Sequence, residues 1–454
     1  MSAVTHPIAH RMSNVYIQAK RLLNFQVASA TVIGLMTGLT MLTEKLQIPA
    51  TIVSLVVYAG MHIVRRDSLI NWLPRPRWAF GVLLFMLAAT LWISAFPDIT
   101  LPQVLRTLIG IVCFAAIVHV VGECQGSDDR CAVLVGACGA VLIAMGFALA
   151  LAAPFVVDWQ GASKLPFVPA ALYSFFTLKV SDSVNPNVMA GALVITVPLA
   201  AAIVIYTRAQ STSELVHLPA WPFWMSLVVS VGVMAMLLLM QSRSALLALF
   251  FVLLLLTGLR WRQMRPPLFV LGLGACAAFL LLPNAARLLF VSSNGAVTGS
   301  ELDQRTEIWT RAWYIIQDFP FTGIGIGSFQ QVTDPLYPFV LNAVSIPHAH
   351  NLFLQVAVDL GIPGLIAWLG ILGYVCLSAW RAYRYGDGWV RALGAGLLAS
   401  NVALCVHGLT DAVTWGMVRS APLVWLLWGT AVAAGQTALD SHRANGKVAE
   451  TQST

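Results

Sequence analysis

The chain has 454 residues, of which 58% are hydrophobic and only 10% are charged. A soluble chain carries about 25% charged residues because a folded surface needs them, so 26 Lys and Arg with 19 Asp and Glu are too few to solvate a globular protein of this size. This composition excludes a disordered chain, a secreted disulfide scaffold and a nucleic-acid-binding domain, and it predicts that most of the chain is solvated by lipid. The basic pI near 9.2 is expected to reflect membrane orientation, because the cations do not gather in one patch interleaved with aromatics.

The apolar segments predict an all-α polytopic membrane protein. A helix needs about 20 mostly apolar residues to cross a bilayer core, and continuous runs such as Leu246 to Leu256 lack the alternation of a barrel strand. Twelve segments are predicted spans: 26–43, 48–64, 79–96, 105–122, 131–153, 188–206, 221–240, 245–259, 267–282, 363–380, 392–410 and 421–437.

The arginines of the short loops predict which way the spans face. They concentrate after the second, eighth and tenth spans, and this bias places those loops and both termini in the cytoplasm. The polar first residues lead directly into a span, so no cleavable signal peptide is expected. None of the seven cysteines lies in an outer loop, so no disulfide framework is expected. The predicted organisation is a cytoplasmic segment 1–25, nine spans within 26–282 including an outer loop 154–187, a large outer loop 283–350, three spans within 351–437 and a cytoplasmic tail 438–454.

The large outer loop contains a predicted amphipathic helix that begins near Ser300. Arg305 projects onto its apolar stripe, whereas Arg311 points to a different face. A cation on a packed face requires an anionic partner, because an unpaired buried charge is very costly; the alternative is that Arg305 snorkels or pairs with a nearby acid. The stripe consists of Ile308, Trp309, Ala312, Trp313 and Ile316.

Three glycines follow this helix. Gly323, Gly325 and Gly327 permit tight turns with positive φ. They match GxGxxG only superficially, since no strand–turn–helix context surrounds them, and we interpret them as turn residues rather than a nucleotide site.

A pair of histidines precedes the tenth span. His350 lies at the start of an apolar helix that Pro363 must break or bend, since proline lacks an amide hydrogen and clashes with the carbonyl four residues earlier. An imidazole at a helix N-terminus is biased towards the neutral form, which can accept a proton as a general base. The alternatives are a structural cap or a headgroup contact. With His348 the pair forms HxH, but no carboxylate or third histidine follows at fixed spacing, so no metal site is predicted. Three further histidines are predicted to be structural: His119, His217 and His407.

Further polar residues lie in the outer turns. Arg243 occupies the turn 241–244 at the expected headgroup level, where one arginine is an ordinary anchor but also a suitable bidentate donor to phosphate. The first outer loop supplies Lys179, and Asn185 and Asn187 open the sixth span, where they could cap the helix or bind sugar hydroxyls.

A family resemblance rests on these motifs. His350-Asn351, nine residues and then Gly361-Ile-Pro-Gly364 resemble the H-N-x9-G-x-x-G signature of bacterial O-antigen ligases. The resemblance extends to the Asn-Pro-Asn opening at 185–187, to Arg243 in a short turn and to Arg305 with Trp309 before a glycine-rich turn. Together these residues are similar to the O-antigen ligase/polymerase superfamily from about 180 to about 415.

The resemblance implies a GT-C-type glycosyltransferase of the bacterial inner membrane with its site facing the periplasm. Such ligases move a glycan from undecaprenyl diphosphate to a sugar hydroxyl of lipid A–core, with inversion and without metal or cofactor. Carried over, Arg243 and Arg305 hold the diphosphate and His350 activates or positions the acceptor. Relatives often carry an arginine before the Asn-Pro-Asn segment, where the nearest cation here is Lys179. Asp411 orients a cation or hydroxyl, or is a polar cap. The implied substrate-binding set is Asn351, Lys179, Asn187, Asn185, Trp309, His348 and Asp411.

Several alternatives remain open at this stage. An O-antigen or exopolysaccharide polymerase would use a lipid-linked acceptor, and a protein O-oligosaccharyltransferase would use a protein. A transporter of lipid-linked glycans would need ionisable residues at span centres, where this chain has almost none.

Overall fold

The computed structural model of the protein describes residues 6–42, 44–124, 128–159, 184–207, 221–281, 301–341, 346–416 and 421–452. Apart from short 3-10 turns and one isolated β-bridge between Val157 and Val184, the regular structure of these ranges is α-helical. The helices are α1 (His6–Leu42), α2 (Gln47–Arg65), α3 (Arg77–Ile93), α4 (Pro97–Glu123), α5 (Asp128–Val156), α6 (Pro186–Val194), α7 (Val197–Thr207), α8 (Trp221–Met240), α9 (Arg243–Arg260), α10 (Arg265–Leu281), α12 (Glu301–Asp318), α13 (Phe329–Leu336), α14 (Leu352–Tyr385), α15 (Gly388–Gly408) and α16 (Ala421–Gln452).

All twelve predicted segments fall largely on helices, and the all-α prediction is confirmed. Within the described ranges, ten helices or helix pairs are long and apolar enough to cross a membrane. The other two predicted spans lie on α3 and α10, which have 17 residues each. The structure is that of a polytopic membrane protein with ten candidate spans.

Several helix bounds differ from the predicted ones, and one predicted span is divided. α1 begins at His6, well before residue 26, and α16 continues to Gln452, past residue 437. The predicted span 188–206 is not one helix, because α6 ends at Val194 and α7 starts at Val197. Pro198 accounts for this break, since its ring would clash with the carbonyl of Val194 in a continuous helix.

The core of the bundle is formed by α4, α14, α15 and α16. α16 packs on α4 and α14, and α15 packs on α7, α9 and α14. Trp428 is fully buried where these helices meet, with its ring 5.4 Å from that of Trp368. Close approach of α16 to α14 depends on Gly435, because a Cβ there would lie 2.5 Å from the backbone oxygen of Ser378.

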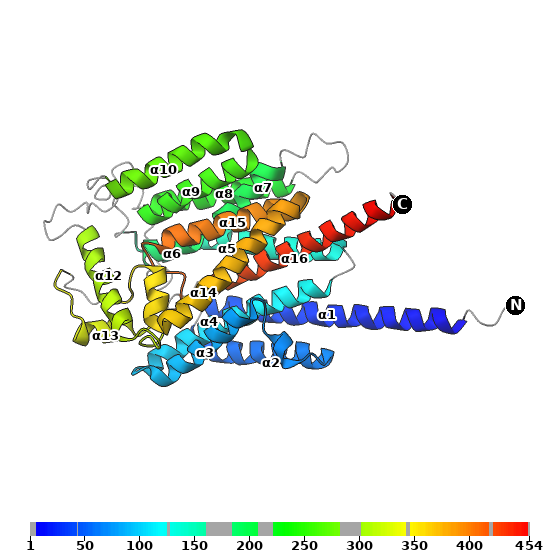
Figure 1. The fold of residues 1–454 in the computed structure, drawn as a ribbon, viewed down its shortest axis with the longest axis horizontal. Helices are drawn as coiled ribbons and strands as arrows, with labels where there is room; N and C mark the ends of the chain where they lie inside the picture. Colours follow the sequence, from blue (N-terminus) through cyan, green and yellow to red (C-terminus); the bar gives the residue numbers. More distant parts are fainter. Residues whose placement is uncertain are drawn as a thin grey trace.

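The two ends of the bundle differ in content. α1 begins and α16 ends at one end, on the right in Figure 1, while α12 and α13 cover the other end. The N-termini of α6, α9 and α14 lie at the same end as α12 (Figure 1). We call this the α12 end. It brings together segments that are far apart in the sequence.

Candidate functional site

α12 brings Arg305 to the loop that follows α15. Ile308, Ala312 and Ile316 are buried against the segment before the kink of α14, as the apolar stripe predicts. Trp313 is 53% exposed, so its assignment to the stripe was wrong; Ile315 is fully buried in its place. The Arg305 guanidinium donates through Nη1 to the backbone oxygen of Thr410, next to Asp411.

Arg311 lies on another face of α12, as predicted. Its Nε donates to the oxygen of Pro338 at 3.1 Å, and its Nη2 lies 3.6 Å from the Glu307 carboxylate. Glu307 in turn accepts from the backbone of Val340 and Leu341 at 2.6 and 3.0 Å. Arg311 therefore contacts the segment after α13. Arg305 is the cation of α12 that contacts the α15 loop.

The glycine-rich segment after α12 is a turn, as predicted. Gly323, Gly325 and Gly327 have φ of 65°, 100° and 83°, in the left-handed region that glycine tolerates. The segment docks on the kink of α14, since Ile324 donates its amide to Val358 O at 2.9 Å.

The kink of α14 confirms the predicted helix break. Gly361 is non-helical with φ 69° and ψ −179°, two residues before Pro363. A short helical segment from Leu352 therefore stands between the histidines and the longer part of α14. Asn351 caps this segment, with its Oδ1 accepting from the amides of Phe353 and Leu354 at 3.0 Å each.

Two histidines and one carboxylate meet at the α12 end. His348 Nε2 lies 3.8 Å and His350 Nδ1 lies 3.6 Å from Oδ1 of Asp411. The two imidazole centroids are 4.1 Å apart. Asp411 is 2% exposed and the His350 side chain is 27% exposed. The buried carboxylate thus lies behind a histidine that reaches the surface of the site.

Hydrogen bonding defines the tautomer of His348. The amide of His350 donates to His348 Nδ1 at 3.2 Å, so Nδ1 has no proton and Nε2 carries it towards Asp411. Burial and the neighbouring His350 lower the pKa of His348 to about 4, against the opposing effect of Asp411. Burial alone would raise the pKa of Asp411, but the neighbouring imidazoles of His350 and His348 bring it below its usual range. The site therefore holds a neutral His348 beside an ionised Asp411 at neutral pH.

Trp309 and Asn351 hold this arrangement from two sides. Trp309 Nε1 donates to the backbone oxygen of His350 at 3.3 Å. Asn351 Nδ2 donates to Leu409 O at 3.0 Å and so ties the start of α14 to the α15 loop. His350 has a positive φ of 45°, a conformation that a non-glycine residue keeps only where its surroundings enforce it. Of the predicted substrate-binding residues, Trp309 therefore contacts the backbone of the histidine turn, and Asn351 fixes the helix start that follows it.

The remaining predicted residues lie at the same end or outside the described ranges. Arg243 is the first residue of α9, after a two-residue turn in which Gln241 has φ 51°. Asn185 caps α6 by accepting from the amide of Asn187 at 2.8 Å, which is the capping role considered for it. Lys179 lies outside the described residues. Among the predicted site residues, Arg305 contacts the α15 loop beside Asp411, and the two histidines lie next to the Asp411 carboxylate.

Two buried ionisable residues that were not predicted from the sequence contact the segments around the site. Asp359 is fully buried and accepts hydrogen bonds from Trp415 and Gln355. Arg106 is 2% exposed on α4 and donates to the oxygen of Gly416 at 2.9 Å. Ionisable residues inside apolar helices were a usable signal, since they are rare there and mark functional regions.

Two histidines and a carboxylate could also hold a divalent metal. Candidate ligand atoms of His348, His350 and Asp411 lie within 4.8 Å of one another, so a carboxylate that the sequence spacing did not reveal is present. A metal there would use His348 Nε2, because its Nδ1 already accepts from the His350 amide. A second such group, at His62, Asp67 and His119, has Arg65 Nη1 3.2 Å from His119 Nε2, which disfavours a cation.

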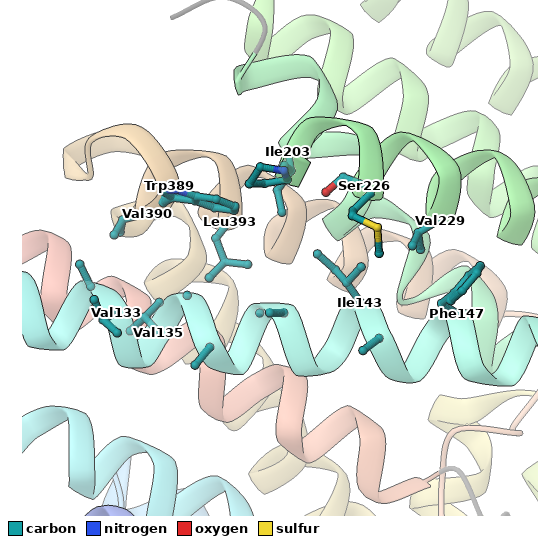
Figure 2. Close-up of a pocket in the computed structure, with 18 of the residues that line it drawn as sticks. Val133, Val135, Ile143, Phe147, Ile203, Ser226, Val229, Trp389, Val390 and Leu393 are labelled. Carbon is teal, nitrogen blue, oxygen red and sulfur yellow. The ribbon is translucent and has the colours of Figure 1, made fainter. Parts of the chain in front are cut away.

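A hydrophobic pocket of about 830 Å³ lies elsewhere in the bundle, between α5, α7, α8 and α15 (Figure 2). The α5 wall consists largely of small side chains such as Gly136, Ala140 and Ala144. Ser226 is a polar lining residue, and none of the described lining residues is titratable. The described lining of this pocket therefore offers no acid, base or cation, whereas the α12 end offers a carboxylate, two imidazoles and a guanidinium.

Part of the chain is similar to a known protein family. No curated protein matches the chain. Residues 225–369 match the model of a protein family described as O-antigen ligase. The matched segment contains Arg243, Arg305 and His350, while Asp411 and the Asn185 cap lie outside it. The match covers 145 of the 454 residues (225–369), and this segment is therefore similar to an O-antigen ligase family domain.

Proposed function

We propose that the protein is an O-antigen ligase, which transfers a glycan from undecaprenyl diphosphate to a sugar hydroxyl of lipid A–core at the periplasmic face of the bacterial inner membrane. The family domain implies a lipid-linked glycan as substrate. The observation that carries the proposal is the cluster of His350, Asp411 and Arg305 at the bundle end opposite the two termini (Figure 1).

Acid–base chemistry is supported by the different settings of the two histidines. His350 is the more exposed, and one of its nitrogens lies 3.6 Å from the buried Asp411 carboxylate. In the proposed reaction the acceptor oxygen bonds to the anomeric carbon, and the bond from that carbon to the phosphate oxygen breaks. The acceptor proton passes to His350, where Asp411 stabilises the resulting imidazolium.

Cations are required for the leaving group. Undecaprenyl diphosphate departs with the bonding electron pair, so its developing charge must be stabilised. Arg305 at the α15 loop and Arg243 at the start of α9 are assigned this role, because guanidinium groups bind phosphate in a bidentate manner and stay charged. Fixed cations at a site poor in water lower such a barrier by several kcal/mol. A direct displacement of this kind inverts the anomeric centre and needs no metal.

A polymerase of the same superfamily is the second candidate. The family domain is compatible with either acceptor, so it supports the polymerase as well as the ligase. The ligase is preferred because of the spacing of His350-Asn351 and Gly361-Ile-Pro-Gly364, which resembles the ligase signature.

The deciding experiment is incubation of the purified protein with undecaprenyl-diphosphate glycan and either lipid A–core or a second lipid-linked repeat. Glycan on lipid A–core is the expected result. Lengthened lipid-linked chains alone would reassign the protein as a polymerase. Absence of transfer to either acceptor would reject both assignments, provided that the protein is folded.

A further inference from the structure

Asp359 lies in the short segment of α14 between the histidine turn and the kink. Its side chain is fully buried, and both of its oxygens accept hydrogen bonds. Oδ2 accepts from Trp415 Nε1 at 2.9 Å, and Oδ1 accepts from Gln355 Nε2 at 2.9 Å and from the amide of Gly327 at 3.3 Å. A buried carboxylate with three donors is well satisfied, and removing its charge leaves donors without acceptors.

Gln355 connects this carboxylate to the histidine turn. Its Oε1 accepts from the amide of Ala349 at 2.7 Å, and Ala349 is the fully buried residue between His348 and His350. The Gln355 amide has one donor end and one acceptor end. Because Asp359 takes the donor end, the acceptor end must face Ala349. The direction of the Gln355 amide therefore depends on Asp359.

The other two bonds reach the neighbouring segments of the site. Trp415 follows Asp411 by four residues in the α15 loop, and Gly327 belongs to the turn that leads from α12. One carboxylate thus joins the loop that carries Asp411, the turn after the helix that carries Arg305, and, through Gln355, the backbone between the two histidines.

We infer that Asp359 is a positioning residue, which orients Gln355 so that the 348–350 turn holds His350 opposite Asp411. This inference rests on the proposed function, in which His350 receives the acceptor proton. Asp359 does not touch the reacting groups and acts through Gln355 and Trp415. A displacement of about 1 Å in a catalytic group costs roughly 100-fold in rate, so the turn must be held firmly.

The test is Asp359→Asn with a rescue by Gln355→Glu. In Asp359→Asn a single oxygen remains for the three donors. If this oxygen stays at Trp415, the new nitrogen faces the Gln355 nitrogen, and Gln355 must turn over and present its nitrogen to the amide of Ala349. If it stays at Gln355 and Gly327, the new nitrogen faces Trp415 Nε1 and the contact with the α15 loop is lost, so one arm of the link fails in either case. In the double variant Gln355→Glu/Asp359→Asn, the carboxylate at position 355 accepts both from the new side-chain amide at position 359 and from the backbone amide of Ala349. This swap preserves the number of charges and restores the polarity of the link.

Two readouts are measured on folded protein. Asp359→Asn is expected to lower kcat by about 30- to 100-fold with the donor KM changed less than about threefold. It should also speed hydrogen–deuterium exchange of the 346–351 amides by about tenfold or more. The double variant should return both values to within about fivefold of wild type. If Asp359→Asn does not accumulate, Gln355→Met, which removes only the link, must show the same two effects.

Asn401→Ala is the matched control. It removes another buried acceptor of a tryptophan indole, at 2.9 Å from Trp428 Nε1, in the bundle rather than at the turn. It is expected to lower stability while leaving kcat and the exchange of 346–351 unchanged. Equal loss of kcat in Asn401→Ala and Asp359→Asn, or a double variant no better than Asp359→Asn, would overturn the inference. If the wild-type protein transfers no glycan, the proposed function fails, and unchanged exchange in Asp359→Asn separately refutes the link.

Discussion

Replacing Asp411 with asparagine tests the pairing of the carboxylate with His350. Asparagine has the same shape and keeps an oxygen for the amide of Ala412, which Asp411 Oδ1 accepts at 2.9 Å. Only the negative charge is lost, so the geometry of the α15 loop should survive. An imidazolium formed at His350 during transfer would then lack its counter-ion.

The separation of the two groups sets the size of the effect. At the 3.6 Å between His350 Nδ1 and Asp411 Oδ1, the Coulomb energy is about 4–5 kcal/mol at an effective dielectric constant of about 20. Partial exposure of His350 reduces this, and about 2–3 kcal/mol should be lost from the transition state. That corresponds to a fall in kcat of about 30- to 150-fold.

Single-turnover transfer of glycan from the lipid-linked donor is the appropriate assay, with folding monitored by thermal unfolding in detergent. Asp387→Asn is the matched control, because it makes the same chemical change at the other end of α15, where the side chain is 87% exposed. A folded Asp411→Asn protein with kcat within about twofold of wild type would refute the electrostatic reasoning.

Three further predictions concern the cation, the second histidine and the metal. Arg305→Lys should raise the donor KM by about tenfold, because a lysine keeps the charge but lacks the bidentate donors. Arg305→Ala also removes the charge and should lower kcat/KM by about 100-fold. A shift in the acceptor KM alone would contradict this assignment. The pKa of His348, lowered to about 4 by burial and His350, means that the unfolded state binds more protons below about pH 6.5. Stability from this group is complete above about pH 6.5 and up to about 3 kcal/mol is lost as the pH falls to about 4. In His348→Gln the thermal unfolding temperature should therefore fall less over this interval, and identical slopes would contradict the shift. Treatment with EDTA should leave transfer unchanged, whereas loss of activity restored by Zn²⁺ would contradict the metal-independent reaction.

The features predicted correctly from the sequence are those encoded locally. Apolar length predicts the spans, helical spacing predicts the buried side of α12, and Pro363 with Gly361 predicts the kink of α14. Trp313 was misplaced because spacing alone does not say how wide the buried stripe is. The break before Pro198 was overlooked because the apolar run continues through it.

The features that the sequence did not reveal depend on contacts between distant segments. Asp411 is far from the histidines in the chain, and only the packing of α14 against α15 brings its carboxylate to His350. The partners of Asp359 likewise come from three different segments. A search for metal or acid–base partners at fixed spacing misses both, because the loop after α15 is placed by tertiary structure.

The central claim is that His350 serves a glycan transfer that releases undecaprenyl diphosphate. The most direct test follows both products, the glycosylated acceptor and the released lipid diphosphate, with purified wild-type protein and His350→Ala. The two products should form in equal amounts with the wild-type protein and should be absent with a folded His350→Ala protein. A folded His350→Ala protein that forms both at the wild-type rate would contradict the account.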